Sequence, residues 1–190
     1  GRVIRCLALF IIFFLSKISA YSKEQPISIR IGVFVGLRTE KPVLKQMTVY
    51  SPSSHRELEL LRDRIAGPEP ELRAAIVDTL LDTVDVESLD NLGLFKGNWP
   101  GKDKILTWRM ADRGVAFLFR CQPQWLSPGK LALQMSFLAS DEVPLRDNMK
   151  REELAQKVLE ATQQEDKMQK ILEEQLVLEQ NEPVILGIPY

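Results

Sequence analysis

The sequence predicts an α+β fold with an antiparallel sheet. Side chains alternate between apolar and polar over residues 27–49 and again over 104–138, whereas residues 58–84 repeat their apolar positions at helical spacing. Strand and helix stretches are therefore segregated rather than alternating, which disfavours a parallel doubly wound sheet. We expect an N-terminal β-hairpin, a helical pair, and an antiparallel C-terminal sheet with a charged helical insertion.

The first twenty residues have the pattern of a secretory signal peptide. Arg2 and Arg5 form a basic start, Cys6–Leu15 is an unbroken apolar run, and small residues end the segment at Ala20. A helix that crosses a bilayer needs about 20 apolar residues, and this run is about half that length. We therefore expect residues 1–20 to direct export and to be removed.

Two alternatives to a cleaved leader remain open. Ile18 is bulkier than the small residue preferred at that place before a cut, so the segment could stay as a signal anchor. An N-terminal core helix is less favoured, because the run is apolar on all sides. We expect a mature single domain over residues 21–190, with 21–98 and 99–190 as an alternative division into subregions.

Composition narrows the classes of partner and the compartment. The chain has 25 basic and 26 acidic residues, and removal of Arg2, Arg5 and Lys17 would leave a formal charge of −4. Such a domain lacks the basic face that nucleic acid or anionic lipid attracts, so we expect membrane contact only through an uncleaved leader. Cys121 would be the one remaining cysteine, which argues for a periplasmic or cell-envelope protein without an internal disulfide.

Residues 21–98 contain the predicted hairpin and helices. The alternating stretches 27–35 and 43–49 are expected to pair across the loop "LRTEKP". Ser54 and Glu57 have the spacing of a capping box at the start of a first helix. A second helix is expected to bury an apolar stripe that Val77 and Leu81 widen. A short helical turn over 89–93 and a loop at "GNWPGKDK" are expected to follow it. The stripe consists of Leu72, Ile76, Leu80 and Val84.

Residues 99–190 favour strands around one helix. The segments "KILTWRM", "GVAFLFRCQ" and "GKLALQMSFL" alternate, and the last two are expected to form a hairpin. Residues 151–163 have the stripe of an exposed amphipathic helix. Residues 168–180 fit either a helix or a strand, and we favour a strand because "QNEP" resembles a turn into the apolar run "VILGIPY".

No constellation of catalytic residues is evident in the sequence. His55 is the single histidine, so a hydrolase triad would have to use it, and no G-x-S-x-G elbow places Ser51, Ser53 or Ser54 beside it. A zinc site would need more histidines or cysteines at close spacing. Cys121 lies on the apolar face of a predicted strand, where a thiol is buried and inert. We expect no enzyme activity, metal or cofactor.

Two further groups of residues have both a structural and a functional interpretation. Asp78, Asp82 and Asp85 share one helix face, and a solvated acidic face explains them better than a calcium site, because no D-x-D-x-D-G loop is present. Trp99, Trp108 and Trp125 are either core residues or anchors at a partner surface. No glycine-rich loop for a nucleotide phosphate is found.

The C-terminal strands resemble the β-domain of secretins from type II and type III secretion systems. The resemblance rests on "RGVAFLFRCQPQWLSPGKLALQMSF" at 113–137 and "EEQLVLEQNEPVILGIPY" at 173–190, with Pro123, Gly129 and Gly187 at the turns. The chain lacks a second glycine after Gly187 and is too short for a full gate and membrane lip. The resemblance implies envelope machinery rather than a pore.

These observations favour a non-catalytic exported protein that serves as a protein–protein interaction or assembly module, including a role in secretion. The alternative is an exported hydrolase that uses His55 and nearby acids. The final strand is apolar on both faces and bracketed by prolines, which is typical of a sheet edge. An apolar edge without charges is a place where another chain can pair. We therefore expect a protein partner or self-association at the edge formed by Val184, Leu186 and Ile188, or pairing of these residues with a further strand.

Overall fold

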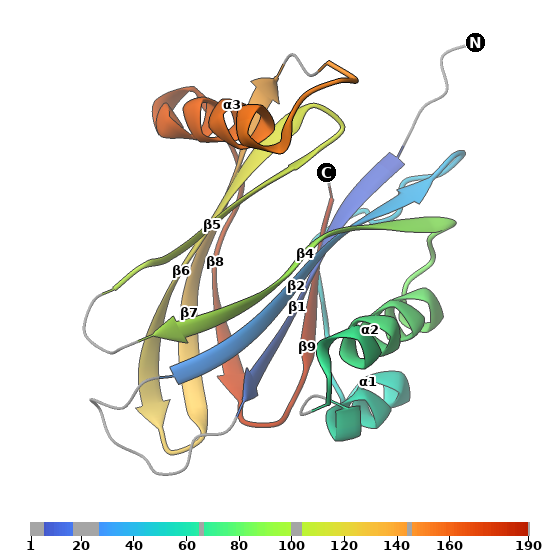
Figure 1. The fold of residues 1–190 in the computed structure, drawn as a ribbon. Coiled ribbons are helices and arrows are strands. Elements are labelled where there is room, and N and C mark those ends of the chain that lie inside the picture. The colour runs from blue at the N-terminus through green and yellow to red at the C-terminus, as the bar shows by residue number, and fades with distance from the viewer. Residues whose placement is uncertain (1–5, 17–26, 65–66, 100–103, 144–145, 190) are drawn as a thin grey trace. The chain divides into compact units, whose positions relative to one another are not determined.

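The computed structural model describes residues 6–16, 27–64, 67–99, 104–143 and 146–189 (Figure 1). In this part of the chain it contains three α-helices and two antiparallel sheets, so the α+β prediction is confirmed. The chain divides into two compact units. The first comprises 1–102, 125–131 and 177–190, and the second comprises 103–124 and 132–176.

The first unit contains a five-stranded sheet with the strand order β3-β9-β1-β2-β4. Its strands are β1 (Cys6–Ser16), β2 (Ile27–Arg38), β3 (Thr48–Tyr50), β4 (Ser88–Trp99) and β9 (Val184–Pro189). The apolar run of the predicted leader is thus the central strand, paired antiparallel with β2 on one side and with β9 on the other. Removal of the leader itself stays a prediction.

The predicted hairpin between residues 27–35 and 43–49 is wrong. Instead, β2 pairs with β1 and β4, and β3 pairs with β9. The reason is burial: β1 and β2 carry apolar side chains on both faces and therefore take interior positions, as strands covered on both sides do. The short β3, with one exposed residue between two half-buried ones, lies at the edge.

Two helical segments cover one face of this sheet. They are α1 (Arg56–Leu61), continued by the 3₁₀ turn η1 (Arg62–Arg64), and α2 (Glu69–Thr83). The predicted stripe of α2 is confirmed, since Leu72, Ile76 and Leu80 are fully buried; Leu81, however, is 45% exposed and does not widen it. The stripe joins one cluster with four side chains of β1, namely Ala8, Phe10, Ile12 and Phe14.

The capping box and the third helical turn are both wrong. His55 occupies the N-cap of α1 without a side-chain cap, and the Ser54 hydroxyl donates to the carbonyl oxygen of Ser51 at 3.1 Å instead. Residues 89–93, expected as a helical turn, lie within β4, as does the start of "GNWPGKDK". β4 pairs with the side of β2 that faces away from β1, from Leu37↔Ser88 to Ile27↔Trp99. Backbone hydrogen bonds to β2 therefore outweigh the tendency of the glycines in this segment to form turns.

The four-stranded sheet has the order β5-β6-β7-β8. Its strands are β5 (Leu106–Asp112), β6 (Val115–Ser127), β7 (Lys130–Glu142) and β8 (Gln169–Glu179), and α3 spans Arg151–Gln163, with the 3₁₀ turn η2 at Glu165–Lys167. The predicted β6–β7 hairpin, the helix over 151–163 and the preference for a strand over 168–180 are confirmed. Gly129 turns the hairpin with a φ of 77°, a backbone conformation that favours glycine.

Among the described residues, no helix is both long enough and apolar enough to cross a membrane.

Candidate functional site

His55 lies in the turn that leads into α1, and its contacts are local. Its Nδ1 is 2.9 Å from the Oγ of Ser54, and its ring meets the ring of Tyr50 edge-on with the centroids 5.0 Å apart. The Ser54 hydroxyl has two acceptors within reach of its proton: the Ser51 carbonyl oxygen at 3.1 Å and, in one imidazole tautomer, His55 Nδ1. A hydrolytic triad needs a carboxylate on the second ring nitrogen. Within the described chain, no hydrogen bond from His55 to a carboxylate is formed.

A hollow of about 390 Å³ lies between α1, η1 and α2. Four acids line it against a single base, Arg64, and Leu60 is exposed at its wall. The four acids are Glu57, Asp63, Asp78 and Asp82. Asp85, which the sequence grouped with Asp78 and Asp82, is instead paired with Arg38. The described residues contain no group of three or more histidine, cysteine or acidic side chains arranged to hold a metal ion.

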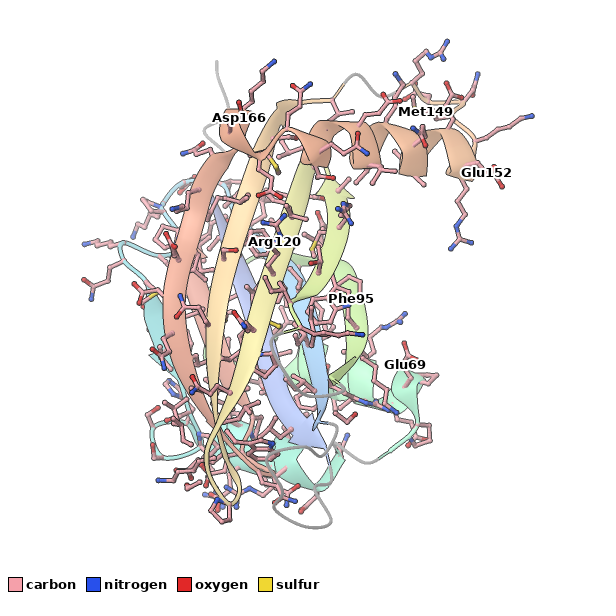
Figure 2. The ribbon with its side chains drawn as sticks, turned by 90° about the vertical axis from the view of Figure 1, so that its left-hand side faces the viewer. Glu69, Phe95, Arg120, Met149, Glu152 and Asp166 are labelled. Atoms are coloured by element: carbon pink, nitrogen blue, oxygen red, sulfur yellow. The ribbon has the colours of Figure 1, made fainter. Side chains whose placement is uncertain are left out.

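Cys121 is buried in the four-stranded sheet, as predicted, beside a smaller hollow of about 190 Å³. Burial raises the pKa of its thiol to about 12, so the nucleophilic thiolate is scarce at neutral pH. Arg120 and Glu173 also line this hollow. Arg120, labelled on β6 in Figure 2, is engaged with Glu165, whose oxygen accepts its hydrogen bond at 2.7 Å. The arrangement gives a structural thiol rather than an activated one.

The prediction that residues 184–188 form a sheet edge is wrong. β9 lies between β1 and β3: Leu186 is opposite Ile11 on one side and Val49 on the other. Val184, Leu186 and Ile188 are buried. Apolar residues on both faces are therefore explained by an interior position. Leu186 could pair with a partner strand only if β1 or β3 left the sheet. A partner contact of these three residues stays a prediction.

The edge on this side of the sheet is formed by β3, one strand further out. Met47, immediately before β3, is 41% exposed, and Val49 within it is 47% exposed. Residues 47–50 carry no charge, whereas the opposite edge strand β4 contains Asp90 and the exposed Lys96. Charged side chains are a usual protection of sheet edges against pairing with another chain. Of the strand predicted over 43–49, only residues 48 and 49 lie in a strand, β3, and its neighbour is β9 rather than β2.

The structure describes the side chains of two of the three tryptophans, and both are half-buried. Trp108 is half-buried on β5 and stacks on Phe119 with ring centroids 5.8 Å apart, so it belongs to the core of the four-stranded sheet. Trp125 is half-buried within β6. The prediction for the Trp99 side chain falls outside what the structure describes.

Comparison of the chain with protein-family models, curated proteins and solved structures gives no match. The resemblance to secretins therefore stays a prediction.

Proposed function

We propose that the protein is a non-catalytic, exported protein of the cell envelope that serves as a protein–protein interaction or assembly module. The observation that carries this proposal is the uncharged edge at β3, where Met47 and Val49 are exposed. Export is supported by the leader-like pattern of residues 1–20. A role in secretion is supported by the residues that resemble secretins, 113–137 and 173–190.

The β3 edge suits the addition of a strand from a protein partner. Met47, immediately before β3, and Val49 within it are both apolar and exposed, and together they form an apolar strip. An added strand would gain main-chain hydrogen bonds along β3, and the strip would supply apolar burial and select matching side chains. Because β3 has only three residues, we expect modest affinity unless further contacts contribute.

The alternative of an exported hydrolase is less well supported. Its required base, His55, contacts Ser54 and Tyr50, and no carboxylate orients it in the part of the chain that the structure describes. A His55→Ala variant separates the two proposals. It should retain partner binding if the protein is an interaction module, whereas a hydrolase would lose its activity.

A pair of matched valines tests the docking edge. Val49 is 47% exposed on β3 and Val177 is 48% exposed on β8, in the other sheet. We expect Val49→Lys to lower capture of the partner from envelope extract, or self-association in sedimentation velocity, by at least about tenfold, since one charge must be desolvated. Val177→Lys should leave both unchanged. The proposal fails if the two variants behave alike, or if the wild-type protein is monomeric and captures nothing.

A further inference from the structure

The central strand β1 fills a slot between β2 and β9. All side chains from Ala8 to Leu15 are fully buried, on both faces of the strand. Its backbone pairs with β2 from Cys6↔Arg38 to Ser16↔Ser28, and with β9 from Ala8↔Pro189 to Phe13↔Val184. No other strand of the described chain has eight consecutive buried residues. The segment with the pattern of a removable leader is thus the most enclosed element of its sheet.

Glycines on both neighbouring strands leave room for the ring of Phe10. A Cβ added at Gly36 of β2 would lie 2.6 Å from Phe10 Cε2, and one added at Gly187 of β9 would lie 3.2 Å from Phe10 Cε1. Gly187 is directly opposite Phe10 in the register. Two strands far apart in the sequence therefore lack a side chain where the same aromatic ring lies. This is a fit to a large side chain at one position, not to any apolar strand.

A third glycine extends the same fit along the slot. Gly32 is directly opposite Ile12, and a Cβ there would lie 2.8 Å from Ile12 Cγ2. Phe10 and Ile12 point to the same face, toward the cluster that α1 and α2 also enter. The slot therefore accommodates alternate side chains of the bound strand, as sites for added strands do.

We infer that the slot between β2 and β9 is a specific binding site for residues 6–16, which stay in the folded protein as its central strand even after a cut behind Ala20. An empty slot would expose two backbone ladders and the apolar faces of both flanking strands, so the bound state is strongly favoured. The inference does not depend on the proposed partner edge at β3.

The test uses the full chain with a specific protease site inserted after Ala20. The protein is folded, cut and passed through a size-exclusion column, and mass spectrometry identifies the fragments in the folded peak. We expect residues 1–20 to elute with residues 21–190, and to separate only in denaturant. Separation of the fragment under native conditions, whether the remainder keeps its sheet or aggregates, would overturn the inference.

Matched phenylalanines test whether the slot is specific. Phe10 and Phe137 are both fully buried, but Phe137 packs against Phe117 and Phe119 on the four-stranded sheet. We expect Phe10→Ala to increase release of the cut fragment by at least about a hundredfold, because a large side chain leaves a cavity. Phe137→Ala should leave fragment release unchanged. Equal release from both variants would count against a specific slot.

Hydrogen exchange of the uncut wild-type chain gives a result that depends on no variant. We expect the amides of residues 7–15 to be as strongly protected as those of β2, and rapid exchange there would overturn the inference.

Adding Val49→Lys to the cut protein distinguishes the two proposals. If both proposals hold, this variant no longer binds its partner at β3 but still retains the cut fragment 1–20. Loss of the partner and retention of the fragment are separate results, and either can fail without the other.

Discussion

The two sheets of this protein are stabilised in different ways. In the five-stranded sheet, β1 has no charged residue and is enclosed by apolar side chains and fitted glycines. In the four-stranded sheet, polar contacts join strands to the segment around α3: Arg109 Nε donates to Thr162 Oγ1 at 3.0 Å, and Arg120 donates to Glu165. We expect the packing around β1 to respond mainly to changes of volume, whereas the four-stranded sheet should respond also to pH and salt.

The largest effect is expected from a charge placed in the core of the first unit. Leu80 is fully buried in the cluster that joins α2 to β1, and Leu80→Asp should lower the free energy of unfolding by more than about 3 kcal/mol. Urea denaturation measures the change. The neighbouring Leu81 is 45% exposed, so Leu81→Asp should stay within about 0.5 kcal/mol of the wild type. Similar losses in the two variants would contradict the face assigned to α2.

A smaller effect is expected from filling the glycine space beside Phe10. Gly36→Ala places a methyl group against the ring and against Val86, at 2.6 and 2.7 Å, and should cost about 1–3 kcal/mol. A smaller partner should relieve this overlap. In a double-mutant cycle, we expect Gly36→Ala with Phe10→Leu to cost less than the sum of the single changes. Strict additivity would show that the two positions do not contact one another.

In the four-stranded sheet, the buried thiol should make stability depend on pH. Burial raises the pKa of Cys121 to about 12 from 9.0, so the unfolded chain loses this proton at lower pH than the folded chain. The stabilisation is complete below about pH 9 and is lost as pH rises toward 12, by up to about 1.4 kcal/mol per pH unit. Urea unfolding at pH 8, 9 and 10 should show this extra slope in the wild type and not in Cys121→Ala. Parallel slopes would contradict a buried thiol.

The smallest effect is expected from the ion pair between Arg120 and Glu165. Both side chains are partly exposed, so Glu165→Gln should cost only about 0–1 kcal/mol in dilute buffer. Salt at about 1 M should remove the difference, because it screens charges beyond a few ångströms. Thermal melts at low and high salt measure this. A difference that persists in high salt would show that hydrogen bonding, not charge, stabilises the contact.

The elements that could be predicted from the sequence are those whose stability is local. The four-residue repeat of Leu72, Ile76 and Leu80 predicted the buried face of α2, and the amphipathic stripe of residues 151–163 predicted α3 with the bounds that it has. The alternation on either side of Gly129 predicted the β6–β7 hairpin. In each case the residues that define the element are neighbours in the chain. Periodicity is therefore enough to recognise it.

Which strands are neighbours, and therefore where the candidate docking edge lies, depends on contacts between distant parts of the chain. An apolar run such as Cys6–Leu15 is compatible with a leader, a helix or a buried strand, because it has no polar face to restrict it. Its place in the sheet depends on two open strand edges, one of them at residues 184–189, and on glycines that accommodate Phe10. The same pairing buries β9 and leaves β3 exposed. Backbone hydrogen bonds between distant segments carry no signal in local residue patterns, which is why the edge could not be located from the sequence.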